Sequence, residues 1–142
     1  RPQGAGFFGR ERGPLTAPVF IYGTLLAPRV FARFAGQGPL RRALPARLTG
    51  WRRVVLRGTP FPTLRRGEGV VDGLLLPRLA PAALARLTAY EGASYALVPL
   101  RVATPRGLRR GRAWIAAPWR AGTRDWLPDD RNMPRGGLPA RM

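Results

Sequence analysis

The sequence of 142 residues contains no cysteine and no histidine. These absences exclude disulfide bonds, thiolate nucleophiles, Ser-His triads, zinc fingers and metal sites built on histidine. Only seven residues are acidic, so we do not expect a metal site made of oxygen ligands either. Catalysis by this chain would have to use a carboxylate, a hydroxyl, an arginine or backbone amides, and we expect neither a metal ion nor a cofactor.

Lysine is absent as well, because all 25 basic residues are arginine, and the formal net charge is +18. Such an excess could bind a nucleic-acid backbone, above all at Arg106, Arg109, Arg110 and Arg112. However, no signature of a nucleic-acid-binding domain accompanies the arginines, which are spread along the chain. We interpret them as solvated surface and expect no nucleic-acid partner; a basic nucleic-acid-binding protein is the alternative.

The length fits one domain, and an apolar content of 45% is enough for a packed core. The sequence has no apolar run of eighteen residues and no signal-peptide pattern, so we expect a cytoplasmic protein without a membrane partner. Glycine and proline are frequent near both ends. We therefore predict a flexible N-terminal arm (1–15), a globular domain (16–127) and a C-terminal tail (128–142); the oligomeric state is left open.

Hydrophobic patterns predict an α+β fold dominated by strands, with a small closed or half-closed barrel of mixed strands and short flanking helices. A short helix is expected from Pro28, and the strongest helix pattern covers 81–90, with proline at its first position and Gly92 after it. The strands are expected at 18–22, 46–57, 69–76, 94–104 and 108–117.

The segment from Tyr22 to Leu26 is expected where the first strand turns into the first helix. A strand end followed by glycine and a helix N-terminus leaves backbone N–H groups without partners. Such a turn can bind a carboxylate or a phosphate. A plain strand-to-helix turn explains the same residues, and the spacing alone does not decide between the two.

Glu91 lies on the stripe of the 81–90 helix that faces the core, since it follows Leu84 by seven residues and Leu87 by four. Burial and the helix C-terminus both raise the pKa of a carboxyl group, as a general acid–base catalyst requires. Nearby arginines would lower that pKa, but we expect desolvation to dominate and to give a carboxylate that is still mostly ionised near neutral pH but poised to accept a proton. The alternative is a structural glutamate paired with an arginine.

Four motifs, taken in order, resemble the γ-glutamylcyclotransferase family, which is also called AIG2-like. The likeness covers about residues 17 to 120 and departs from the family pattern at Leu76, Thr88 and Leu97, so it does not identify the substrate. The motifs are Tyr22-Gly23-Thr24-Leu25, Phe61-Pro62-Thr63-Leu64, Val71-Asp72-Gly73-Leu74-Leu75, and Leu87-Thr88-Ala89-Tyr90-Glu91-Gly92 followed by Tyr95.

This resemblance implies a small β-barrel with a pocket, and an enzyme that cyclises a γ-glutamyl group to 5-oxoproline and releases an amine or an amino acid. The partner it implies is a small γ-glutamyl molecule. Glu91 would be the general acid and base. The backbone amides of Gly23, Thr24 and Leu25 would hold the α-carboxylate or the oxyanion, and Tyr22 and Tyr95 would wall the pocket. A catalytically silent AIG2-like module that binds a metabolite or a partner is the alternative.

Overall fold

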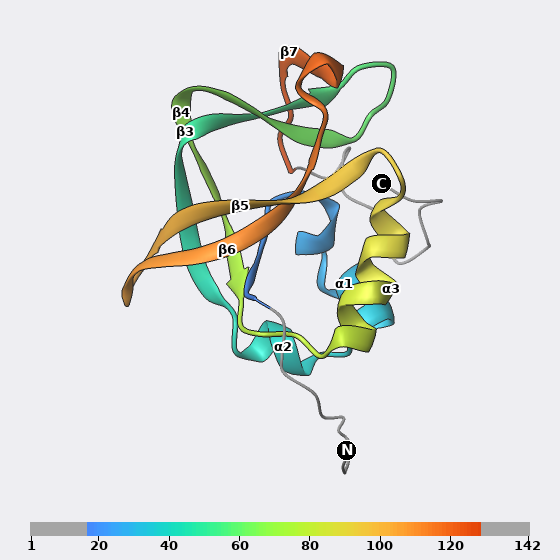
Figure 1. The fold of residues 1–142 in the computed structure, drawn as a ribbon, viewed down its shortest axis with the longest axis vertical. Coiled ribbons are helices and arrows are strands. Elements are labelled where there is room, and N and C mark those ends of the chain that lie inside the picture. The colour runs from blue at the N-terminus through green and yellow to red at the C-terminus, as the bar shows by residue number, and fades with distance from the viewer. Residues whose placement is uncertain (1–16, 129–142) are drawn as a thin grey trace.

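The computed structural model describes residues 17–128 (Figure 1). The predicted arm (1–15) and all but the first residue of the predicted tail (128–142) lie outside the described residues. The strands are β2 (Val19–Ile21), β3 (Leu44–Leu56), β4 (Pro62–Leu76), β5 (Tyr95–Thr104), β6 (Gly107–Ala116) and β7 (Ala121–Asp125). The helices are α1 (Pro28–Ala35), α2 (Gly38–Arg41) and α3 (Pro81–Glu91), with single 3-10 turns η1 (Thr24–Leu26) and η2 (Pro118–Arg120).

Five strands close into a barrel in the order β4-β2-β6-β5-β3, because β3 also pairs with β4. The β2–β6 pair is parallel and the other pairs are antiparallel, which confirms the predicted barrel of mixed strands. Closure removes the exposed sheet edges that an open sheet would carry. The short β2 therefore lies between two neighbouring strands. After Tyr22 the chain turns into η1 and α1.

The core has two parts, one inside the barrel and one between the barrel and its helices. Alternate residues of β2 serve both parts, since Phe20 packs inside the barrel while Val19 and Ile21 pack under α1 and α3. Figure 1 shows α1 and α3 side by side on one flank of the barrel, with α2 near its lower end. None of the helices described is long and apolar enough to cross a membrane.

Three elements differ from the sequence prediction. β4 begins at Pro62 rather than near 69, and α2 and β7 were not predicted. Proline is tolerated at the first position of a strand, and the glycines at 67 and 69 hide the strand pattern that follows it. β7 has no apolar alternation of its own, and it forms because it pairs with the end of β3 at Val54 and Leu56.

The close approach of β2 to β4 requires a glycine at position 73. A Cβ atom there would overlap the carbonyl oxygen of Ile21 and lie 2.9 Å from the ring of Phe20. Both obstacles belong to buried β2, one of them being backbone, so neither can move aside at low cost.

We therefore expect Gly73→Ala to lower the free energy of unfolding by about 1–3 kcal/mol, measured by chemical denaturation. Gly67→Ala is the matched control on the same strand, because its Cβ would meet only the Cδ of Arg52, at 3.7 Å. Equal stability of the two variants would contradict the proposed reason for Gly73.

Candidate active site

The loop from Tyr22 to Leu26 is built around the 3-10 turn η1. Its 3-10 turn is closed by hydrogen bonds from Leu26 N to Gly23 O (2.9 Å) and from Ala27 N to Thr24 O (3.1 Å). The N–H groups of Gly23 and Leu25 find no acceptor among residues 17–128. Two backbone donors are thus left for a ligand at the start of a helical turn.

Gly23 is needed for close packing of this loop against the barrel. A Cβ atom at Gly23 would lie 2.7 Å from Cγ of Pro62, the first residue of β4. The ring of a proline cannot rotate away as a flexible side chain can. The loop backbone therefore lies closer to β4 than any residue with a side chain would allow.

Glu91 is the last residue of α3, and its side chain is buried, with 6% of its surface exposed. This confirms the core-facing position predicted from the helical spacing. Gly92 follows at φ 90° and ends the helix through a hydrogen bond from its N–H to the carbonyl of Thr88. Glu91 therefore stands at the C-terminal end of α3, beside the loop.

Burial raises the pKa of Glu91 from its ordinary 4.5 to about 8. The sequence-based expectation of a mostly ionised carboxylate at neutral pH is therefore wrong, because a carboxyl with this pKa is mostly protonated at pH 7. The arginines expected to oppose the shift make no ion pair with Glu91 in the part of the chain that the structure describes. The ion pairs found there are Arg47–Asp72 (2.9 Å) and Arg52–Asp125 (2.6 Å), both at the surface.

A small cavity brings the loop and Glu91 together. Tyr22 to Leu25, Glu91, Pro62 and Trp114 are among the residues that line it. Its volume is about 10 Å³, which holds about one water molecule. The predicted site residues of the loop thus meet Glu91 across 69 residues of sequence, whereas Tyr95 is not among the lining residues.

Three tyrosine hydroxyls brace the walls of this cavity. Tyr90, next to Glu91, shares a hydrogen bond of 3.1 Å with Oγ1 of Thr24 and so ties α3 to the loop. Tyr22 donates to the carbonyl of Trp114, and Tyr95 donates to the carbonyl of Pro62 at 2.7 Å. Tyr95 thus holds a residue of the wall in place instead of facing the cavity.

Tyr22 is buried, with 6% of its surface exposed. Burial, and in smaller part the charge of Glu91, raise the pKa of Tyr22 well above its usual 10.0. The phenol therefore stays neutral and acts as a donor. Glu91 is consequently the group at this cavity with a pKa near the physiological range.

Sequence reasoning missed two polar groups near the site. Thr63 is fully buried, and its hydroxyl accepts a hydrogen bond of 3.0 Å from the N–H of Ala116 and also contacts the Tyr22 phenol. Trp114 is buried, and its indole N–H has no hydrogen-bond partner within residues 17–128. Thr63 gave a signal, as a polar residue inside the Phe61–Leu64 motif, but Trp114 resembled an ordinary core residue.

A larger hollow of about 870 Å³ lies along α1 and α2, with Arg29, Arg33 and Arg41 among its lining residues. None of the described residues that line it is acidic, so the smaller cavity at Glu91 is the better candidate for acid–base chemistry. Nowhere in residues 17–128 do three acidic side chains gather in a way that could hold a metal ion. Of the arginines considered for nucleic acid, Arg106, Arg109 and Arg110 are exposed and Arg112 is half-buried.

Comparison with known proteins confirms the family that the sequence motifs resemble. The family described as gamma-glutamyl cyclotransferase, AIG2-like, matches residues 19–129. Protein AIG2 C of Arabidopsis thaliana is 31% identical over 90 residues, which make up 63% of this chain and 53% of that protein. The chain thus spans about half the length of this curated relative.

Two solved structures illustrate the likeness in fold. An Arabidopsis thaliana protein solved in solution superposes with a TM-score of 0.65 at 25% identity, over 83% of this chain and 72% of its own. A structure named gamma-glutamyl cyclotransferase superposes with a TM-score of 0.57 at 19% identity, over 71% and 66% respectively. The family match covers most of this chain, and the matched residues form the five-stranded barrel. The chain therefore belongs to the gamma-glutamyl cyclotransferase, AIG2-like family.

Proposed function

We propose that this protein is an enzyme that cyclises a γ-glutamyl group to 5-oxoproline and releases an amine or an amino acid, with Glu91 as the general acid and base. One observation carries the proposal. A buried carboxyl with a pKa of about 8 lines the same small cavity as Gly23 and Leu25, whose N–H groups have no acceptor among residues 17–128. Membership of the family supports the same reaction.

The reaction needs no nucleophile from the protein, which suits a chain without cysteine or histidine. The α-amine nitrogen of the substrate attacks its own γ-carbonyl carbon, and the new C–N bond closes a five-membered lactam. The bond from that carbon to the leaving nitrogen breaks. Holding the substrate in the curled conformation is worth up to ~7–11 kcal/mol in well-oriented intramolecular cases.

Glu91 moves the proton in this scheme. Its ionised form accepts a proton from the attacking amine, and its protonated form then delivers a proton to the leaving nitrogen. A pKa of about 8 lies near physiological pH, so both the ionised and the protonated form of Glu91 are populated there. This is the condition that favours general acid–base catalysis.

The loop amides bind the negative charge. A γ-glutamyl substrate carries an α-carboxylate, and none of the residues found to line the cavity is an arginine. The N–H groups of Gly23 and Leu25 are the donors that the cavity offers to this carboxylate or to the oxyanion formed during attack. The cavity is also smaller than the substrate, so it must widen when the substrate binds.

A cavity smaller than the substrate also fits a second candidate function. In this alternative the protein is a catalytically silent member of the family that binds a metabolite or a partner. Incubation with a panel of γ-glutamyl amines and γ-glutamyl amino acids, scored for 5-oxoproline, separates the two. Formation of 5-oxoproline identifies an enzyme.

Glu91→Gln keeps the shape of the side chain and removes the base. We expect kcat on the best substrate of the panel to fall by ~10²-fold or more, while the protein stays folded. Glu68→Gln is the control, since Glu68 is an exposed carboxylate on β4, and it should leave kcat unchanged. Comparable turnover by the Glu91 variant and the parent would show that Glu91 is not the proton-transfer group.

We expect the Glu91 carboxyl to titrate near pH 8 in the folded protein. Selective ¹³C labelling of glutamate side chains gives signals from three residues at most, at positions 11, 68 and 91, and Glu91→Gln assigns one of them. A midpoint below pH 6 for the assigned signal would contradict the effect of burial.

The raised pKa of Glu91 also makes the free energy of unfolding depend on pH. Between about 4.5 and 8 the folded state holds a proton that the unfolded state releases, so the free energy of unfolding falls as the pH rises. The free energy of unfolding should fall by roughly 1 kcal/mol per pH unit in that window, and this fall should be absent from Glu91→Gln.

Thr24→Pro distorts the turn that holds the N–H groups of Gly23 and Leu25, and we expect KM to rise by about 10- to 100-fold, as for a lost hydrogen bond to a charged group. Thr24→Val is the matched control, because it keeps the N–H and removes only the hydroxyl that meets Tyr90. An unchanged KM and kcat in Thr24→Pro would refute anion binding by the loop.

A further inference from the structure

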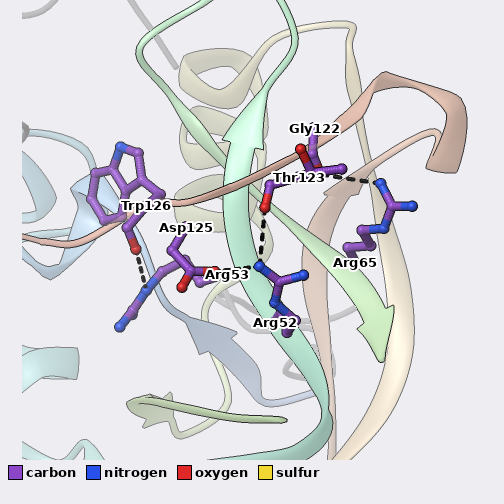
Figure 2. A network of polar contacts seen from close by, with 7 residues as sticks. All are labelled: Arg52, Arg53, Arg65, Gly122, Thr123, Asp125 and Trp126. Atoms are coloured by element: carbon purple, nitrogen blue, oxygen red, sulfur yellow. Dashed lines mark hydrogen bonds and ion pairs between the residues drawn. The ribbon is translucent and has the colours of Figure 1, made fainter. Parts of the chain in front are cut away.

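Arg53 on β3 reaches the backbone of the loop from outside the cavity. Its Nη1 donates hydrogen bonds to the carbonyl of Tyr22 at 2.8 Å and to the carbonyl of Asp72 at 3.2 Å. Its Nε donates to the carbonyl of Trp126 at 3.3 Å (Figure 2). The half-buried guanidinium thus joins β3, β4, the end of β2 and the segment after β7.

These contacts use carbonyl groups rather than carboxylates. The Asp72 carboxylate pairs with Arg47 instead, and in the described chain Arg53 has no ion pair of its own. Burial lowers the pKa of Arg53, but an arginine in a protein stays charged. Its full positive charge therefore acts on the Tyr22 carbonyl.

Fixing the Tyr22 carbonyl also fixes the next amide. The peptide bonds of the described chain are all trans, and in a trans peptide the C=O and the following N–H point in opposite directions. The Gly23 N–H therefore points away from Arg53. Gly23 lines the cavity with Glu91, whereas Arg53 is not among the lining residues.

From this geometry we propose that Arg53 is a positioning residue, which aims and polarises the Gly23 N–H toward the anionic group of the substrate. A cation bound to a carbonyl draws electron density from the peptide group, so the N–H at its other end becomes a stronger donor. The inference rests on the proposed function for the identity of the anion. The orientation of the amide does not depend on it.

Trp126 holds Arg53 in this position. It is buried, its N–H donates to the Arg53 carbonyl at 3.0 Å, and its indole N–H donates to the carbonyl of Pro60 at 2.8 Å. The Arg53 guanidinium lies 5.9 Å from the centre of the Trp126 ring. An arginine can serve several carbonyls at fixed angles through its planar fork, and a lysine cannot.

The neighbouring arginine provides a matched control. Arg52 is the preceding residue of β3, and Figure 2 shows its side chain turned toward Thr123 and Asp125, whereas Arg53 contacts Trp126. Arg52→Gln removes an equally well-bonded guanidinium without touching Tyr22. Successive residues of a strand point to opposite faces, which explains the different contacts.

The experiment compares Arg53→Lys, Arg53→Gln and Arg52→Gln with the parent protein. We expect kcat/KM on the best γ-glutamyl substrate to fall by about 10- to 100-fold in both Arg53 variants, as for a misplaced binding group, and by less than about threefold in Arg52→Gln. Thermal unfolding checks that each variant is folded, and Arg53→Lys is used if Arg53→Gln is not.

A spectroscopic measurement tests the same contact without turnover. The three tyrosines are followed by Gly23, Glu91 and Ala96, so ¹³C-carbonyl tyrosine combined with ¹⁵N-glycine gives one HNCO signal, from the Tyr22–Gly23 peptide. We expect this signal to move in both Arg53 variants and to stay in place in Arg52→Gln.

An unmoved signal, or kcat/KM within about threefold of the parent in both Arg53 variants, would overturn the positioning role. If the parent converts no γ-glutamyl compound, the proposed function fails. The HNCO signal then still decides whether Arg53 orients the Gly23 amide.

Discussion

The burial of one carboxyl group without a counter-charge sets the conditions for the rest of the site. Glu91 ends α3 inside the protein, and although the chain has 25 arginines, none of those described pairs with it. Desolvation is therefore left unopposed, and it raises the pKa of the carboxyl to about 8. A group that would be a permanent anion at the surface becomes one that gains and loses a proton near neutral pH.

The tyrosines beside Glu91 do not titrate in the same pH range as its carboxyl group. Burial raises the pKa values of Tyr22 and Tyr90, so both phenols remain neutral over the range in which Glu91 titrates. Their hydroxyls serve as hydrogen-bond partners of the Trp114 carbonyl and of Thr24. The tyrosines thereby hold the walls of the cavity without competing for its proton.

In the proposed function the backbone of the loop binds the negative charge, and that backbone must then be held firmly. The loop is packed against Pro62 of β4, tied to α3 through the Thr24–Tyr90 hydrogen bond and attached to β3 through Arg53. The hydrogen bond to α3 joins neutral groups and is worth about 1 kcal/mol, and Leu25 of the loop is buried in the same core as Leu87 and Tyr90 of α3. The loop backbone is thus held from β3, β4 and α3 together.

The sequence by itself determined what depends on local pattern. Proline at the first turn and Gly92 at the end located α3, and the helical spacing placed Glu91 on its buried face. The turn chemistry after β2 located the loop, and the ordered motifs indicated the family.

Only the tertiary structure decided what depends on distant partners. β7 forms because it pairs with the end of β3. Tyr95 supports the wall of the cavity because its hydroxyl donates a hydrogen bond to the carbonyl of Pro62. Arg53 looks like any other arginine of the chain until the fold sets the Tyr22 carbonyl in front of it. The pKa of Glu91 follows the same rule, since desolvation is the combined effect of all the atoms packed around a group, and a local pattern can give its direction but not its size.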